Sequence, residues 1–362
     1  MTVSLNEREL LRAARDGDHG SFGRLVERYR VELRAHCYRM LGSVPDAEDA
    51  LQETLLRAWR GLQRFEGRSS LRSWLYTIAT NSCLRAIERR PNRVLPIDYG
   101  PPADPHDGPA EPLVESVWLE PYPDEGLGLD GALLGPEARY EQRESVELAF
   151  TAALQLVPAR QRAVLILRDV LGFSAAETAN ALETTSAAVD SALQRAHKTV
   201  DERLPEQSQQ ENLRSLGDDG LGAIVERYVD AWERNDVGAV VSMLTEDARI
   251  TMPPLPSWYS GREAVATFLR ALPLSAAKRW RLVPTSANAQ PAFGAYLWDE
   301  AAGIFSLHDV IVLTLRGSEI EELTAFLDPG ALRQFDLPES IGSATSASVS
   351  RGFPKSTARQ TH

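Results

Sequence analysis

A stretch near the middle of the chain, residues 96–136, contains nine acidic residues and no lysine or arginine. Proline, glycine and acids dominate this stretch, so it is too rich in proline for a helix and too acidic to collapse by itself. We predict a linker here, and the chain on either side of it must fold as separate modules. The apolar residues that interrupt it indicate that part of the linker docks on another surface: Val114, Val117, Trp118 and Leu119.

The segments on either side of this linker share a helical periodicity, which is replaced by a different pattern further along the chain. Helical periodicity runs through residues 6–95 and returns over residues 137–204. A second polar linker, residues 205–220, leads into residues 221–337, where two helical segments precede several strand-like runs. Residues 338–362 are rich in Ser, Thr and Ala, and we predict a disordered tail there. The predicted fold class is therefore multidomain, with two all-α modules followed by a C-terminal α+β domain.

Composition excludes several classes of protein. No run of 18 uncharged apolar residues is present, which excludes a membrane span. The charged N-terminus lacks the apolar stretch of a secretory signal. Cys37 and Cys83 are too few for a disulfide scaffold, and no CxxC or HExxH spacing offers a metal site. We expect a cytoplasmic protein without a metal or cofactor.

The net charge of −12 is distributed unevenly along the chain. Residues 1–95 contain 17 Arg and 12 Asp or Glu, a net charge of +5, whereas the rest of the chain is acidic. A basic N-terminal region hints at contact with nucleic acid. Arginine suits phosphate recognition, although codon bias in a GC-rich genome explains its abundance equally well.

Two neighbouring helices are predicted in the first module. Leu51, Leu55 and Ala58 lie on one face of the first helix, and acids precede arginines on the other face, as the helix dipole favours. That pattern by itself indicates only a solvated amphipathic helix. The second helix, in FEGRSSLRSWLYTIATNSCLRAIERR, carries side chains of the kinds that stack on unpaired bases and bind phosphate. These are Trp74, Tyr76, Asn81, Arg85 and Arg89. A core position for Trp74 is an equally good interpretation.

The second helical module has helix-capping residues at the spacing of a helix-turn-helix. Its first helix ends at a Leu-Gly pair, Gly172 being the C-cap. Ser174 begins the next helix, with Glu177 three residues later completing a capping box. A longer third helix follows Thr185 and, in such a motif, enters the major groove by its N-terminal end. A generic helical hairpin is the alternative.

The segments PDAEDALQETLLRAW and FEGRSSLRSWLYTIATNSCLRAIERR resemble the second conserved region of bacterial sigma factors of the extracytoplasmic-function (group 4) class. The resemblance implies that the first helix binds the clamp coiled coil of the RNA polymerase large subunit. It assigns this contact to Asp49, Gln52, Glu53, Leu56 and Trp59. The following loop and helix would melt and read the minus-ten promoter element, and extruding a base costs a few kcal/mol. The implied pocket for that base is Gly67, Arg68, Ser69 and Ser70, with Asn81 and Arg85 on the reading helix.

The helix-turn-helix resembles the fourth conserved region of the same sigma factors, which binds the minus-thirty-five element and the polymerase flap. The positions that the resemblance assigns to DNA are Thr185, Ser186, Ala187, Ala188, Ser191, Arg195 and Lys198. The sequence departs from the family pattern at the usual turn glycine, which is Glu183 here. It also departs at two positions that normally carry basic phosphate contacts, Asp190 and Ala192. Fewer phosphate contacts predict weaker duplex binding with a flatter salt dependence.

Residues 221–337 resemble SnoaL-like cone domains of the nuclear-transport-factor superfamily, in which a curved sheet wraps around a pocket. The side chains that would line this pocket are Tyr228, Trp232, Trp258, Tyr259, Trp280, Tyr296 and His308. Some relatives are isomerases or cyclases that use Asp or His as an acid or base. No spacing among the acids and the histidine here argues for catalysis, and fold alone does not decide function. The resemblance implies modulation of sigma activity in cis, with an unidentified small ligand as a further partner; a purely packing role is the alternative.

The predicted function is that of a sigma factor without chemistry of its own, which binds core RNA polymerase and directs initiation at particular promoters. Its expected partners are core polymerase and promoter DNA, and no membrane. Two other classes stay open. A SnoaL-like isomerase or hydrolase with a DNA-binding arm would turn over a small molecule without polymerase, and a stand-alone helix-turn-helix regulator would bind duplex DNA tightly by itself.

Overall fold

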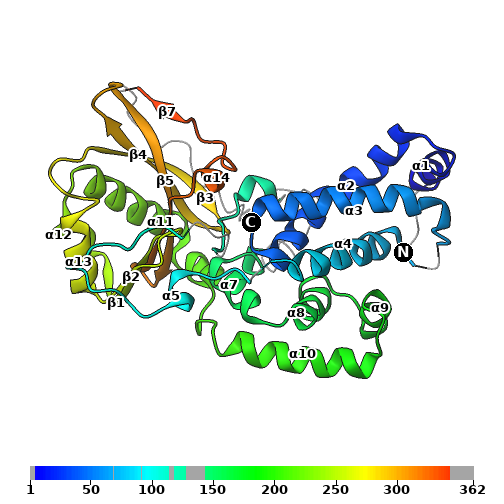
Figure 1. The fold of residues 1–362 in the computed structure, drawn as a ribbon. Coiled ribbons are helices and arrows are strands. Elements are labelled where there is room, and N and C mark those ends of the chain that lie inside the picture. Colours follow the sequence, from blue (N-terminus) through cyan, green and yellow to red (C-terminus); the bar gives the residue numbers. More distant parts are fainter. Residues whose placement is uncertain (1–4, 68, 91, 114–117, 128–142, 343–362) are drawn as a thin grey trace, which may run out of the picture. The chain divides into compact units, whose positions relative to one another are not determined.

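The structure is a computed structural model that describes residues 5–67, 69–90, 92–113, 118–127 and 143–342. The chain forms two compact units (Figure 1). One unit, residues 1–93 with 125–204, is helical, and the other, residues 94–124 with 205–362, contains a single sheet with helices. The fold class predicted from the sequence is confirmed. None of the described helices is long and apolar enough to cross a membrane.

The N-terminal part of the first unit is a helical bundle. Its elements are α1 (Leu5–Arg15), α2 (His19–Leu41), α3 (Val44–Gly61), the 3-10 turn η1 (Leu62–Arg64) and α4 (Leu71–Ile87). Gly42, with φ of 67°, ends α2, and the Ser43 hydroxyl accepts a hydrogen bond from the Asp46 amide at 3.3 Å to begin α3. These adjacent caps fix the tight turn between the two helices.

The rest of the first unit contains the helix-turn-helix. Its elements are α7 (Leu148–Leu156), α8 (Ala159–Leu165), the π-helical segment η3 (Ile166–Val170), α9 (Ala175–Ala181) and α10 (Ser186–Asp201). The predicted capping box is confirmed: Ser174 Oγ accepts from the Glu177 amide at 3.2 Å, and Glu177 Oε2 accepts from the Ser174 amide at 2.9 Å. The side chain of Thr185 caps α10 in the same way, at 3.2 Å from the Ala188 amide.

The second unit has one sheet in the order β2-β1-β6-β5-β4-β3, with β7 paired to β5. The strands are β1 (Leu244–Thr251), β2 (Trp258–Ser260), β3 (Trp280–Ala287), β4 (Gln290–Asp299), β5 (Ile304–Arg316), β6 (Glu319–Phe326) and β7 (Ser340–Ile341). The helical elements are α5 (Pro96–Tyr99), α11 (Gln209–Glu233), α12 (Val237–Ser242), α13 (Arg262–Ala271) and α14 (Pro329–Leu332). The 3-10 turn η2 (Asp124–Leu127) lies where the chain passes from the second unit back to the first. β1 runs parallel to β6, and the other pairs are antiparallel.

The core of the second unit lies between the sheet and its helices. α11 packs on β3, β4 and β5, while α13 packs on β1 and β2. Tyr228 of α11 and Phe268 of α13 belong to one buried cluster with Phe293 and Leu313 of the sheet. This continuous apolar interior is the main source of the unit's stability.

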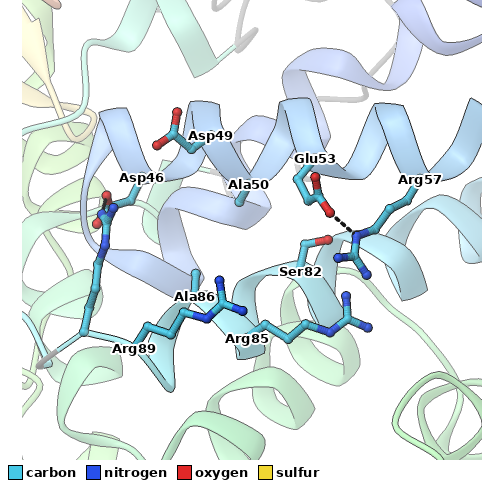
Figure 2. A pocket seen from close by; sticks show the side chains of 10 residues that line it. Asp46, Asp49, Ala50, Glu53, Arg57, Ser82, Arg85, Ala86 and Arg89 are labelled. Carbon is cyan, nitrogen blue, oxygen red and sulfur yellow. Dashed lines mark hydrogen bonds and ion pairs between the residues drawn. The ribbon is translucent and has the colours of Figure 1, made fainter.

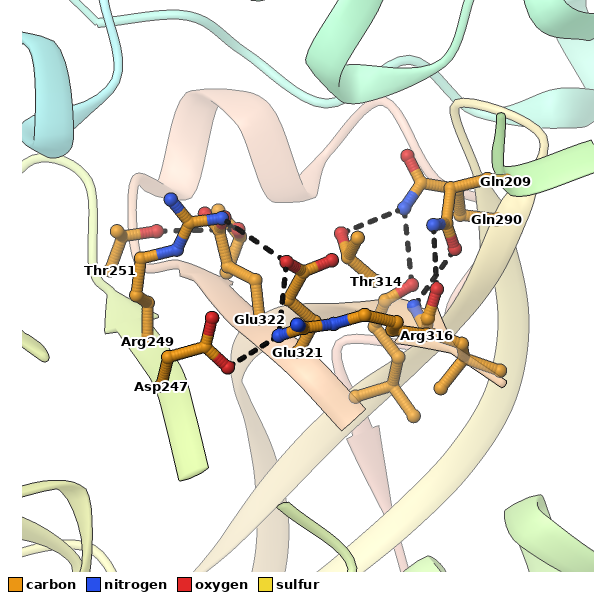
Figure 3. A network of polar contacts seen from close by, with 12 residues as sticks. Gln209, Asp247, Arg249, Thr251, Gln290, Thr314, Arg316, Glu321 and Glu322 are labelled. Carbon is orange, nitrogen blue, oxygen red and sulfur yellow. Dashed lines mark hydrogen bonds and ion pairs between the residues drawn. The ribbon is translucent and has the colours of Figure 1, made fainter. Parts of the chain in front are cut away.

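The predicted linker over residues 205–220 differs from the structure, in which α11 begins at Gln209. Gln209 is buried and donates to the Leu315 carbonyl at 2.8 Å, while the Leu315 amide donates back to its side chain at 2.8 Å (Figure 3). The Asn212 side chain makes a similar pair of bonds with the backbone of Gly317, at 3.2 and 2.9 Å. These amides anchor the helix to the turn after β5, which orders a segment that is polar in composition.

The predicted 96–136 linker is also largely ordered where it is described, because residues 94–124 pack with the second unit. Trp118 and Leu119 are buried, as their apolar character predicts, whereas Val114 and Val117 lie outside the described residues. In the predicted tail, Ser340–Ile341 form β7 on the edge of β5. Residues 343–362 are outside the described part of the chain.

Candidate functional site

A groove of about 370 Å³ lies between α3 and α4 in the first unit. Figure 2 shows its lining residues: Asp46, Asp49, Ala50, Glu53 and Arg57 from α3, then Ser82, Arg85, Ala86 and Arg89 from α4 and the turn after it. The two sets predicted separately, Asp49 and Glu53 for polymerase and Arg85 and Arg89 for DNA, therefore face one groove. Sequence reasoning missed Arg57 and Ser82, although their helical spacing from Glu53 and Arg85 places them on the same faces.

The charges in this groove are unevenly paired. Asp46 forms ion pairs with Arg90 and with Arg93, the latter at 2.7 Å, and Glu53 pairs with Arg57. In contrast, no described carboxylate pairs with Arg85 or Arg89, and both arginines are exposed. Two unpaired guanidinium groups are therefore available to bind phosphate from outside.

The outer face of α3 carries the other residues predicted to bind polymerase. Gln52 is exposed, and Leu56 is 43% exposed. Trp59 is half-buried, with its ring centroid 4.2 Å from that of His19 and 5.2 Å from that of Phe22. A tryptophan held in place by neighbouring rings is one of the residue types enriched in protein-binding surfaces.

The loop before α4 presents small polar residues to solvent. Gly67, Ser69 and Ser70 are exposed, and Gly67 has φ of 74°, which favours glycine at that position. Ser70 also caps α4, since its Oγ accepts from the Ser73 amide at 3.0 Å. Arg68 lies outside the described residues. The base pocket implied by the resemblance stays a prediction.

The two predicted DNA-stacking aromatics lie in different environments. Trp74 is half-buried, and its ring centroid is 4.9 Å from that of Phe65. Tyr76 is fully buried, donates to Glu32 at 3.2 Å and makes an edge contact with Phe173 of the helix-turn-helix module. A stacking role for Tyr76 on DNA would require Phe173 to move away, so in this arrangement its ring is part of the core.

The two helical modules contact each other through buried arginines. Arg162 of α8 is 1% exposed and donates to the Met40 carbonyl at the end of α2, as well as to the Gln155 and Val157 carbonyls at 3.0 and 3.2 Å. Arg39 of α2 donates in the other direction, to the Ser145 carbonyl at 3.0 Å. A cation at the C-terminal end of α2 also complements the helix dipole. Burial lowers the pKa of Arg162 to about 10, so it is still charged at neutral pH.

The recognition helix α10 is exposed along the face that the resemblance assigns to DNA. Val189, Ala196 and Val200 are buried and fix the inner face. The exposed side chains include every residue assigned to the minus-thirty-five element: Thr185, Ser186, Ala187, Ala188, Ser191, Arg195 and Lys198. His197 is engaged with Asp169 of η3, at 2.9 Å.

The turn before α10 stores strain at Glu183, whose φ is 52°. A residue with a Cβ in this region costs about 1 kcal/mol relative to glycine. We expect Glu183→Gly to raise the free energy of unfolding by up to about 1 kcal/mol, measured as a higher urea midpoint. Asn180→Gly, at an exposed position in the last turn of α9, is the matched control and should not raise the midpoint, since its backbone is helical and glycine gains nothing there. A lower midpoint for Glu183→Gly would contradict this explanation.

The aromatic residues predicted to line a pocket in the second unit are buried. Tyr228, Trp232, Tyr259 and Trp280 belong to its apolar core, and Trp258 and Tyr296 are also buried. His308 differs from them, because its side chain is 39% exposed and its Nδ1 lies 2.8 Å from Asp309 Oδ2. Whether these residues hold a ligand stays a prediction.

Comparison with known proteins decides the family. Residues 25–93 match the model for sigma-70 region 2, residues 147–200 the model for sigma-70 region 4, and residues 225–323 the SnoaL-like domain. The chain is 41% identical to the ECF RNA polymerase sigma factor SigG of Mycobacterium tuberculosis, over 90% of this chain and 86% of that protein. The chain belongs to the ECF RNA polymerase sigma factors.

Other ECF sigma factors match over shorter or more divergent stretches. SigM of M. tuberculosis is 29% identical over 53% of this chain and 81% of its own length. The crystal structure of M. tuberculosis SigJ, an extracytoplasmic function sigma factor, aligns with a TM-score of 0.53 at 21% identity, covering 86% of this chain and all of that one. The ECF fold with an appended α+β domain is thus shared with a solved structure.

Proposed function

We propose that this ECF sigma factor binds core RNA polymerase through α3 and reads promoters through α4, the loop before it, and α10. The observation that carries the proposal is the groove between α3 and α4, where Arg85 and Arg89, neither of them paired with a described carboxylate, face Asp49 and Glu53. Packed helices hold these groups at fixed spacing, so the contacts to polymerase and to the opened strand are set by one bundle. Such a chain acts where polymerase acts, in the cytoplasm, and needs no catalytic step of its own.

In-vitro transcription tests this function directly. Core polymerase supplied with the full chain and genomic fragments should yield transcripts from a discrete set of start sites, and none from those sites without the chain. A tight, sequence-specific complex of the chain with duplex DNA in the absence of polymerase would instead favour a stand-alone regulator.

The arrangement of the first unit supports a closed resting state. Phe173 of the helix-turn-helix module covers Tyr76 of α4, and the Arg72 guanidinium donates to the Leu171 carbonyl at 3.4 Å. Because the minus-ten and minus-thirty-five elements are separated along DNA, the two modules must part for both to be read. Polymerase would drive this opening by binding the open state more tightly than the closed one.

The segment that joins the two helical modules is anchored to the C-terminal unit, which supports modulation in cis. The Trp258 indole donates to the Gly100 carbonyl at 2.8 Å, and the Ala103 amide donates to the Trp258 carbonyl at 2.8 Å. Further along, the Tyr122 amide donates to Asn288 Oδ1 at 2.8 Å, and the Asn288 amide donates to the Tyr122 carbonyl at 2.8 Å. A docked segment shortens the free chain between the modules and so restrains their separation.

Releasing this segment should raise transcription. Asn288 has φ of 55°, which glycine adopts easily, so Asn288→Gly keeps the turn and removes the side-chain acceptor for Tyr122. We expect a severalfold increase in multi-round transcription at equal polymerase occupancy. Ala289→Gly, at φ of 57° in the same turn, is the control, because the neighbouring side-chain bond is untouched. Equal activity of Asn288→Gly and the wild type would contradict modulation through this contact, and lower activity would show that the docked segment is needed for initiation.

A catalytic role for the C-terminal unit has one observation in its favour. Asp309 is buried beside His308, and burial raises the pKa of its carboxyl, while its Oδ1 contacts no polar partner among the described residues. An acid of this kind can take part in proton transfer. Steady turnover of a small molecule by the full chain without polymerase would support this second candidate.

A further inference from the structure

Asp190, an acidic residue, lies in the N-terminal turns of α10, where a helix that reads DNA would be expected to carry basic side chains. Asp190 is exposed, one residue beyond the fully buried Val189 that fixes the inner face of the helix. No basic side chain in the described part of the chain pairs with it. Its neighbours one turn away, Ser186 and Gln194, are uncharged. No ion pair with a described residue therefore holds this carboxylate in place.

The side chains around Asp190 are small. Ala187, Ala188 and Ser191 are all exposed, and the first basic residue of the helix is Arg195. Small side chains allow a helix to lie close to the floor of the major groove, where even a short carboxylate reaches the base edges. A carboxylate near DNA is repelled by the phosphates, so it is favourable there only when it accepts a hydrogen bond from a base.

The chemistry of the groove limits which base can provide that bond. Guanine and thymine present acceptors in the major groove, while cytosine presents the N4 amino group and adenine presents N6. Adenine N6 lies beside N7, an acceptor that repels the second carboxylate oxygen. Cytosine carries no acceptor of its own next to N4. A free carboxylate thus favours cytosine over the other three bases.

We propose that Asp190 determines promoter specificity by accepting a hydrogen bond from the N4 amino group of one cytosine in the minus-thirty-five element. This inference rests on the proposed function of α10 as the helix that reads that element. The proposal explains why an acid occupies this position. Asp190 would read a nucleobase, whereas the basic residue usual in the family would contact a phosphate.

The test uses the full chain, core polymerase and a promoter library randomised over the minus-thirty-five element, with sequencing of the templates that are transcribed. The wild type should enrich cytosine about tenfold at one position. Asp190→Asn should shift that position to adenine, because a carboxamide pairs with both N6 and N7 of adenine. Asp190→Ala should remove the base preference at that position. Asp201→Asn, which changes the same charge in the last turn of α10, is the matched control and should keep the cytosine.

Two results would overturn the proposal. One is a wild-type profile without a cytosine preference that depends on Asp190. The other is an equal rise in transcription from all templates for Asp190→Asn and Asp190→Ala, which would show that the carboxylate only repels phosphate. Absence of any transcript with the wild-type chain would contradict the proposed function itself, and is recognised before any template is sequenced.

Discussion

Replacing Asp49 and Glu53 by arginine is expected to abolish co-purification of the chain with core RNA polymerase. Both acids lie on α3 beside the exposed Leu56, so the double variant reverses the charge next to the apolar centre of the proposed interface. Loss of one partner in a desolvated charge pair costs about 2–5 kcal/mol. Two reversals should therefore weaken binding by at least about a hundredfold.

The control for this variant carries the same change of charge elsewhere on the unit. Glu9 and Asp16 are exposed acids at α1 and just after it, and Glu9→Arg with Asp16→Arg should leave polymerase binding unchanged. Because Glu53 pairs with Arg57, circular dichroism must show that the Asp49 and Glu53 double variant keeps its helical signal. Normal co-purification by a folded double variant would show that α3 is not the polymerase-binding helix.

Features of this protein that depend on neighbours in sequence were predictable. The capping box at Ser174 and Glu177 needs only residues three apart, and it forms as predicted. The stripe of Leu51, Leu55 and Ala58 likewise follows from helical periodicity, and it faces the interior of the bundle. The same local patterns placed Asp49 and Glu53 on one helix and Arg85 on the next, whereas Arg89 lies in the turn after α4.

Features that depend on distant partners were not predictable. The run Gln209, Gln210 and Asn212 is polar and indicates a linker, yet each amide side chain is buried against backbone groups 79 to 106 residues away. The contact between Tyr76 and Phe173 likewise joins residues far apart in sequence, and nothing in the local pattern of α4 reveals it. Composition measures how polar a segment is, but it does not show which carbonyl accepts its hydrogen bonds.

The aromatic residues of the C-terminal unit illustrate the same limit. The resemblance to SnoaL-like domains assigns seven side chains to a pocket, but aromatic rings suit both a pocket wall and a core. In the structure Tyr228 and Trp280 belong to the apolar cluster, and only His308 among the seven is exposed. Burial and ligand binding favour the same residue types, so the pattern alone does not distinguish them.

Removing Asn81 and Arg85 together is expected to abolish promoter opening while sparing polymerase binding. The Arg85 side chain is exposed without an ion pair to any described residue, and Asn81 lies half-buried one helical turn before it on α4. A hydrogen bond to a charged group contributes about 1.5–3 kcal/mol. Loss of two such contacts to the strand should lower the open-complex equilibrium by at least about a hundredfold.

Permanganate footprinting of thymines in the promoter bubble measures this effect, since only unpaired thymines react. Asn81→Ala with Arg85→Ala should remove the reactive thymines at a polymerase occupancy equal to that of the wild type. Arg8→Ala, an exposed arginine on α1, is the control for a lost positive charge and should leave the bubble intact. Because neither Asn81 nor Arg85 is fully buried, the helical signal should also be kept. A normal bubble in the double variant would place the strand-reading surface elsewhere on the chain, and α4 would then serve only to hold α3 in position.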